Sequence, residues 1–154
     1  MTPPPPLRVG LISDTHNLLR PEALAFLRGA DHIVHAGDIT GQAVLDELAE
    51  LAPLTAVRGN NDRGEWAARL AEVEVVQLGA VRVCVIHDLA LLDRDLAGID
   101  VVVSGHSHKP LAERRRGVLY VNPGSAGPRR FRLPIAVAEL LIDGPSVSPR
   151  IVEL

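Results

Sequence analysis

Side chains that can bind metal ions follow several apolar segments of the chain, at the point where each segment ends. Three early segments are followed by Asp14-Thr15-His16, by Gly37-Asp38 and by Gly59-Asn60-Asn61-Asp62. Two later segments end at His87 and at Gly105-His106-Ser107-His108. Carboxylate, amide and imidazole groups without a thiolate suit Mn, Fe(II), Zn or Ni better than a structural cysteine–zinc site. The chain therefore predicts a divalent metal site built from oxygen and nitrogen donors.

The number of candidate ligands indicates two ions rather than one. Taken singly, each block is also typical of a turn, a helix cap or a buried histidine, so the prediction rests on their combination. Together they are too many for one tetrahedral ion, and they suit two ions that share a bridging carboxylate, as in two-metal phosphoryl-transfer enzymes. The candidates are Asp14, His16, Asp38, Asn60, His87, His106 and His108.

The segments that would carry these ligands alternate between strand and helix in the first part of the chain. Strands are expected at 7–13, 32–36 and 54–58, with helices at 21–29 and 42–51 between them. This order favours parallel strands with crossover helices, and ligands bind at the carboxyl ends of such strands. The later pattern predicts a hairpin at 73–78 and 81–86, a short helical stretch at 89–96, and strands at 101–104, 117–121, 135–142 and 150–154.

The composition fits one compact domain and excludes some classes of function. The 154 residues are 47% hydrophobic and carry a formal net charge of −3, which argues against disorder and against an overall basic surface for nucleic acid. Residues 1–6 predict a proline-rich tail and residues 7–154 a single domain. Only 3% of the residues are aromatic, too few for a platform that stacks several bases.

The chain shows no signal for secretion or for a membrane. Its single cysteine, Cys84, cannot form an internal disulfide and is expected to be a small buried side chain. The first residues lack the apolar region of a secretory signal, and no apolar run approaches the roughly 20 residues of a membrane span. We therefore expect a cytoplasmic protein without membrane association.

The ordered blocks quoted above resemble the signature of the calcineurin-like metallophosphoesterase superfamily, and the resemblance runs from Leu7 to about Ser125. The short length, Gly105–Pro110 and Val121–Ser125 are similar to a branch of small single-domain bacterial and archaeal phosphodiesterases. That branch shares its fold with the small retromer subunit. The resemblance implies an α/β fold of two packed mixed β-sheets flanked by helices, with the metals at one edge.

The resemblance also implies which residues hold each ion. The first ion would be held by Asp14, His16, Asp38 and His108, and the second by Asp38, Asn60, His87 and His106, so that Asp38 is the bridge. A hydroxide shared by the two ions would attack phosphorus in line. The implied cofactors are two divalent ions, with Mn favoured and Fe, Zn or Ni open. Asp38, Asn61 and His106 are the expected catalytic residues.

Two departures from the family pattern bear on the substrate. Many family phosphatases have histidine after the ligand asparagine, where it helps to protonate the leaving group, but this chain has Asn61. Asparagine cannot supply a proton near pH 7, which favours a phosphodiester over a poor-leaving-group monoester. Asp88 follows His87 where glycine is more usual. Asn17 and Asn61 are candidate phosphate-binding amides, with turn residues as the equal alternative.

Other roles stay open at the level of sequence. Asp62 is expected to hold a ligand in place. The arginine runs at 114–116 and 129–132 predict a solvated hairpin, with docking of a polyanionic substrate as the alternative. The expected partner is a phosphate-ester substrate, with nucleic acid only as a substrate, and self-association into a homo-oligomer is open. A non-catalytic interaction scaffold on the same fold is the main competing hypothesis, and a mononuclear metal sensor is a third.

Overall fold

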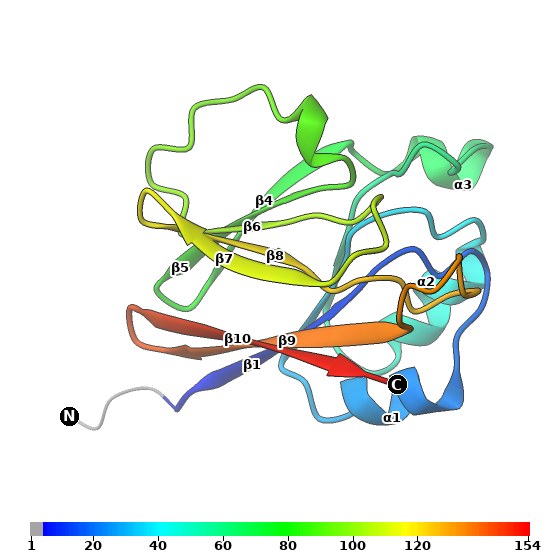
Figure 1. The fold of residues 1–154 in the computed structure, drawn as a ribbon, viewed down its shortest axis with the longest axis horizontal. Helices are drawn as coiled ribbons and strands as arrows, with labels where there is room; N and C mark the ends of the chain where they lie inside the picture. The colour runs from blue at the N-terminus through cyan, green and yellow to red at the C-terminus, as the bar shows by residue number, and fades with distance from the viewer. Residues whose placement is uncertain (1–4) are drawn as a thin grey trace.

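The computed structural model describes residues 5–154, so most of the expected proline-rich tail, residues 1–4, lies outside the described residues. Pro5 and Pro6 are exposed and lead directly into the first strand. Two five-stranded mixed sheets pack face to face, and Figure 1 shows them one above the other. This arrangement confirms the expected α/β fold of two packed sheets.

The first sheet has the strand order β10-β9-β1-β2-β3. Strands β1, β2 and β3 run parallel, whereas β9 pairs antiparallel with both β1 and β10. Its members are β1 (Leu7–Ile12), β2 (His32–His35), β3 (Leu54–Ala56), β9 (Ala136–Asp143) and β10 (Ser146–Glu153). The strands β1 and β2 are joined by α1 (Pro21–Leu27), and β2 and β3 by α2 (Gln42–Ala49).

The second sheet has the strand order β4-β5-β6-β8-β7. Its central strands β5, β6 and β8 are parallel, and the edge strands β4 and β7 are antiparallel to their neighbours. Its members are β4 (Val73–Leu78), β5 (Val81–Ile86), β6 (Val101–Val103), β7 (Leu111–Arg115) and β8 (Val118–Asn122). A short helix, α3 (Glu65–Ala68), precedes β4, and a 3-10 turn, η1 (Leu89–Leu91), follows β5.

The main core lies between the two sheets and is almost entirely aliphatic. Val9 and Leu11 of β1 face Val83 and Val103 of the second sheet within one fully buried cluster. A second cluster packs α1 and α2 against the outer face of the first sheet. A Cβ at Gly10 would lie 2.5 Å from Leu27 Cδ2, so glycine at this point of β1 lets α1 approach closely.

The sequence predicted most of these elements but not all. Strand β7 was not predicted, because an edge strand with mostly exposed side chains lacks the apolar pattern of a core strand. The arginine run at 114–116 ends this strand and forms its turn to β8, as in the expected hairpin, whereas the run at 129–132 forms none, because it lies between β8 and β9 of different sheets. Helix α3 was also missed, the helical stretch at 89–96 shrinks to η1, and β10 begins earlier than expected. Among residues 5–154, no helix is long and apolar enough to cross a membrane.

Candidate metal centre

The loops that follow five strands meet at one end of the two sheets. The first sheet supplies the loops after β1, β2 and β3, and the second sheet supplies those after β5 and β6. Backbone hydrogen bonds join these loops, because Asp14 N donates to Gly37 O at 3.0 Å and Gly105 N donates to His87 O at 2.9 Å. Each of these bonds joins loops of one sheet, and His87 Nδ1, which donates to Ala36 O at 2.8 Å, links the two sheets. The loops therefore form one connected rim.

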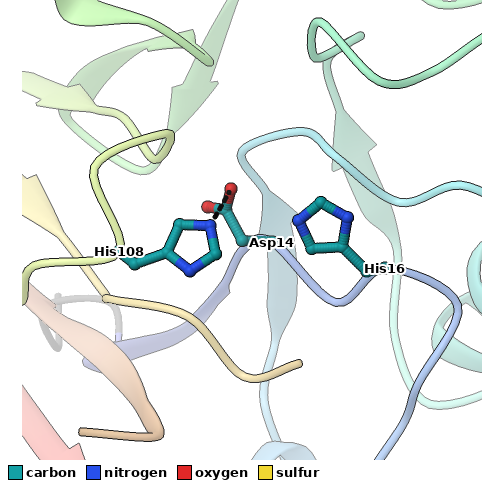
Figure 2. Close-up of side chains that lie close together, drawn as sticks. All are labelled: Asp14, His16 and His108. Atoms are coloured by element: carbon teal, nitrogen blue, oxygen red, sulfur yellow. Dashed lines mark ion pairs between the residues drawn. The ribbon is translucent and has the colours of Figure 1, made fainter. Parts of the chain in front are cut away.

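A first group of possible ligands consists of Asp14, His16 and His108, whose donor atoms lie within 4.8 Å of one another. His108 Nε2 lies 3.3 Å from Asp14 Oδ1. Figure 2 shows the two imidazole rings on either side of the Asp14 carboxylate. Asp14 and His108 are buried and His16 is half-buried, so the group sits at the floor of the rim.

A second group consists of Asp14, Asp38 and His87, all of them buried. His87 Nε2 lies 3.3 Å from Asp38 Oδ2 and 4.0 Å from Asp14 Oδ1. Asp14 is shared by the two groups, and Asp38 Oδ2 also comes within 3.7 Å of His16 Nε2. Both carboxylates therefore lie between the two sets of imidazoles.

Asn60 and His106 lie at the outer side of the second group. Asn60 Oδ1 is 3.0 Å from His87 Nε2 and 3.2 Å from His106 Nδ1. The His106 side chain is 46% exposed, and its Nε2 is 3.8 Å from Asp88 Oδ2. These two residues are the most accessible of the seven candidate ligands, so the centre is open to solvent on their side.

Asn61 and Asn17 are both exposed at the rim, but their contacts differ. Asn61 donates two hydrogen bonds to Asp38, from Nδ2 to Oδ2 and from its backbone N to Oδ1, both 2.9 Å long. Asn17 N donates to Ile39 O at 2.7 Å. The amide of Asn61 thus orients the Asp38 carboxylate.

Asp62 holds the loop that carries Asp38. Its buried carboxylate accepts four backbone hydrogen bonds of 2.8 to 3.0 Å, from Asp38, Ile39, Thr40 and Gly59. An ionised acceptor strengthens such bonds relative to neutral ones. The residue expected to hold a ligand in place therefore fastens the loops after β2 and β3 to each other.

Three unpartnered atoms test whether these residues suit a metal ion. Among residues 5–154, four buried side-chain atoms lack a hydrogen-bond partner, and apart from Arg20 Nε they belong to the first group: Asp14 Oδ1, His16 Nε2 and His108 Nδ1. Asp14 Oδ2, in contrast, accepts from Ser13 Oγ at 2.6 Å and from His106 N at 3.2 Å. Buried polar atoms are seldom left unpaired unless an ion or water satisfies them. The donor set therefore fits a divalent cation at Asp14 Oδ1 and His16 Nε2.

The carboxylates of the centre are ionised at neutral pH. Burial raises the pKa of Asp14, but the nearby His108 imidazole and the hydrogen bond from Ser13 outweigh it, so the pKa lies below its usual value. For Asp38, burial is again outweighed, by hydrogen bonds from His87 and Asn61 that hold its pKa well below the usual range. Two adjacent carboxylates in this state attract cations strongly.

The backbone of the rim is unusually strained. Of the non-glycine residues with positive φ in the described part of the chain, all but Arg116 and Phe131 lie in these loops: Asp14, His16, Asn17, Asp38, Thr40, His106 and His108. Each such residue costs on the order of 1 kcal/mol or more and is retained where function requires it. A Cβ at Gly59 would lie 2.3 Å from Asp38 N, so glycine before the ligand is needed there for close approach.

His35 is a site residue whose role the sequence left unassigned. It is fully buried beneath the rim, with its Nε2 2.9 Å from Thr15 Oγ1, and its Nδ1 accepts from Gly37 N at 3.1 Å. Because Nδ1 accepts, Nε2 must carry the proton in the neutral ring. Burial lowers the pKa of His35 to about 3. The ring therefore braces the backbone beside Asp14 and beside Asp38 as a neutral group.

Comparison with known proteins places these residues in context. The sequence profile of the calcineurin-like phosphoesterase superfamily domain matches residues 7–144. A probable metallophosphoesterase of Methanothermobacter thermautotrophicus is 37% identical over 159 residues, covering 94% of this chain and 91% of the relative. A probable metallophosphoesterase of Methanocaldococcus jannaschii is 35% identical over 133 residues, covering 76% and 67%.

Two further matches bear on activity and on fold. A phosphodiesterase of Methanocaldococcus jannaschii is 27% identical over 138 residues, covering 77% of this chain and 83% of the relative. The structure of vacuolar protein sorting 29 from Cryptosporidium parvum superposes with a TM-score of 0.84 at 20% identity, over 97% of this chain and 92% of that one. The latter match concerns the fold alone.

Proposed function

The chain belongs to the calcineurin-like phosphoesterase superfamily, and we propose that it is a phosphodiesterase with a centre of two divalent metal ions. The family and the two groups of possible ligands support a metal-dependent phosphoesterase. The observation that carries the proposal is the position of Asp14 and Asp38 between the two sets of imidazoles. A shared carboxylate is what two neighbouring cations require.

We assign the ligands as the sequence predicts them. Asp14, His16, Asp38 and His108 would hold one ion, and Asp38, Asn60, His87 and His106 the other. When bound, two divalent cations supply a hydroxide nucleophile at neutral pH and offset the charge of the phosphoryl oxygens. Mn is our first choice for both ions, and the same donors also accept Fe, Zn or Ni.

The chain's own residues orient this centre. His87 Nδ1 donates to Ala36 O at 2.8 Å, which fixes the orientation of the ring and places Nε2 3.3 Å from Asp38 Oδ2. Asn61 and Asp62 hold the Asp38 carboxylate and its loop in place. We propose that Asn17 and Asn61 lie against the phosphate, and that His106, on the open side, is the catalytic imidazole nearest the solvent.

The preference for a diester rests on Asn61 and on a relative. An amide cannot protonate a leaving oxygen near pH 7, and the Asn61 amide already donates to Asp38. A relative that is 27% identical is named a phosphodiesterase. Both observations favour a phosphodiester, whose leaving group can depart without a proton from Asn61.

The test is a metal count together with a paired assay. The protein is purified without chelator, its bound metal is measured, and hydrolysis of an aryl phosphodiester and an aryl monoester is compared with added Mn²⁺. We expect two ions per chain and faster diester turnover. In Asp38→Asn the kcat/KM should fall by about 100-fold or more, as for loss of a group that holds the metal. Asp143→Asn, an exposed carboxylate variant in the β9–β10 hairpin, should match the wild type.

A non-catalytic scaffold is the second candidate, and the fold shared with vacuolar protein sorting 29 favours it. It predicts that the wild type hydrolyses neither ester faster than Asp38→Asn does, whether or not a divalent ion is bound. Turnover that survives the loss of Asp38 would also refute the two-ion proposal. The retained set of seven donors is the reason to place the enzyme first.

A further inference from the structure

A basic loop stands beside the metal centre and is fixed to it. The loop lies between β8 and β9, and its first residues bond to the loop that carries Asp14. Ser125 Oγ donates to Asp14 O at 3.0 Å, and Ala126 N donates to Ser13 O at 3.0 Å. Arg20 Nη2 adds a hydrogen bond to Gly127 O at 3.2 Å. The start of this loop therefore keeps a fixed position relative to the candidate ligands.

The tip of the loop presents an aromatic ring to solvent. Leu133 N donates to Arg130 O at 3.1 Å and closes a turn, within which Phe131 has a φ of 55°. Phe131 is 89% exposed, more than any other large apolar side chain in the described part of the chain. A bulky residue in this conformation is strained, and a fully exposed phenylalanine gains nothing from burial. Folding alone does not account for this ring.

Three cations next to Phe131 in the chain, together with Lys109 in the same groove, have no ion-pair partner in the described part of the chain. Lys109, Arg129, Arg130 and Arg132 form no salt bridge within residues 5–154, whereas Arg8, Arg58, Arg115 and Arg150 each pair with a glutamate. The segments 104–112 and 123–134 contain no aspartate or glutamate at all. Other arginines of the chain also lack an ion-pair partner among the described residues, but here four basic side chains lie in segments without any carboxylate.

The ring and three of these cations line one open groove. It has a volume of about 940 Å³ and is lined by Ser107, Lys109, Arg130, Phe131, Arg132 and Leu133. Ser107 and Lys109 stand on either side of the candidate ligand His108 in the chain. Both residues also line a neighbouring cavity that contains His106, so the groove adjoins the cavity beside this candidate ligand.

We propose that this groove binds a short single-stranded oligonucleotide, with one base stacked on Phe131 and its phosphates on Arg130, Arg132 and Lys109. The proposal rests on the proposed function, because the scissile phosphate would lie at the metal centre. A small diester has one phosphate, and that phosphate is needed at the metals. The extra cations suit further phosphates, and the exposed ring suits a base that is free to leave its stack.

The same features limit the length and type of the substrate. One exposed aromatic side chain accommodates one base, in keeping with an aromatic content too low for a platform of several. A duplex keeps its bases paired, so a stacking site of this kind selects single strands. The positive charge is confined to one loop and Lys109, which suits a few nucleotides at a strand end rather than a long tract.

Equilibrium binding tests the proposal without relying on turnover. The Mn²⁺-loaded protein is titrated against fluorescein-labelled hexathymidylate with phosphorothioate linkages, which keep the charges and resist hydrolysis, and anisotropy is measured between about 50 and 200 mM KCl. Phe131→Ala should weaken binding by about tenfold and leave the salt dependence unchanged. Arg130→Ala and Arg132→Ala should each reduce the slope of log K against log salt by about 0.7.

The control is Arg116→Ala, an exposed arginine in the β7–β8 turn that also has a positive φ. It should bind the oligonucleotide like the wild type, and thermal melts confirm that all variants fold. An unchanged Kd in Phe131→Ala would overturn the nucleotide assignment, and unchanged salt slopes in both arginine variants would overturn the phosphate contacts. Hydrolysis of bis(para-nitrophenyl) phosphate by the wild type, which needs no second phosphate, separates either failure from a failure of the proposed function.

Discussion

The Nε2 atom of His87 lies 3.3 Å from the Oδ2 atom of Asp38, although β5 and β2 belong to different sheets. Each side chain makes a further hydrogen bond that fixes it. His87 donates to Ala36 O, and Asp38 accepts from the backbone and side-chain amides of Asn61. The pKa of His87 is raised, because hydrogen bonding to Asp38 and the nearby carboxylates outweigh its burial. The pair is therefore preset before any cation binds.

Loss of the Asp62 carboxylate should weaken both the fold and the metal site. In Asp62→Asn the side-chain NH₂ faces backbone N–H donors, so buried donors lose their acceptor. We expect a loss of about 2–3 kcal/mol in the free energy of unfolding, measured by urea denaturation of the metal-free protein. Metal affinity should fall by about 10–100-fold.

Asp46→Asn is the matched control for this substitution. Asp46 is exposed on α2 and accepts one hydrogen bond, from Gln42 Nε2. Its free energy of unfolding should stay within about 0.5 kcal/mol of the wild type. Equal effects of the two substitutions would show that the four backbone hydrogen bonds of Asp62 add nothing specific.

Asn61→His should shift the enzyme toward monoesters. A histidine can deliver a proton to the leaving oxygen near neutral pH, which asparagine cannot do. We expect the ratio of monoester to diester kcat/KM to rise by about tenfold or more. Asn61→Gln, which adds no proton source, should leave that ratio as it is. If Asn61→His leaves the ratio unchanged, this position does not set the choice of leaving group.

His35 should make the metal-free protein less stable in acid. Its pKa is about 3 when folded and about 6.5 when unfolded, so between these values the unfolded state binds more protons. Stability from this group is therefore complete above about pH 6.5 and is lost as the pH falls toward 3, by at most about 1.4 kcal/mol per pH unit. The measurement is urea unfolding with chelator from pH 7 down to about pH 4.5, compared with His35→Gln.

The His35→Gln variant should be less stable than the wild type at pH 7, because glutamine reproduces the hydrogen bonds of the buried ring only in part. The gap should narrow as the pH falls, since the variant has no proton to gain at this position. A gap that stays constant with pH would mean that His35 titrates alike in both states.

Removal of metal should lower the melting temperature. Two ionised carboxylates then face each other without a cation, and the stabilisation by a bound ligand is lost. At a metal concentration of about 100 times Kd, that stabilisation is about 2.7 kcal/mol per site. Each occupied site should therefore raise the melting temperature by about 5–10 °C in a chain of this size. Calorimetry with Mn²⁺ and with EDTA measures it, and Asp38→Asn should show a smaller shift. Equal melting temperatures in Mn²⁺ and EDTA would contradict a bound ion.

The positions of the candidate ligands could be predicted because each follows an apolar strand. Asp14, Asp38 and His87 end runs of aliphatic residues, and parallel strands bring such ends together. The hairpin of β4 and β5 was predicted to the residue, since a two-residue turn separates two apolar runs. Sequence pattern is informative in these places because burial and strand period dictate it.

Other features depend on contacts between distant segments and leave no local signal. The hydrogen bonds from Asn61 to Asp38, the bracing by His35 and the positive φ of His106 all arise from how loops pack across the rim. Strand β7 was missed because pairing with β8, rather than burial, defines it. The grouping of Arg130 and Phe131 with Lys109 likewise appears only when residues far apart in the chain are placed together.

The division of donors between the sheets has a mechanical consequence. Every oxygen donor of the proposed centre comes from loops of the first sheet, and three of its four imidazoles come from the second. Bound cations would therefore link the two sheets, and any sliding of one sheet over the other would separate the donor atoms. The aliphatic core between the sheets resists such sliding and thus supports the proposed centre. Substitutions that weaken this core far from the rim should therefore lower the affinity for metal.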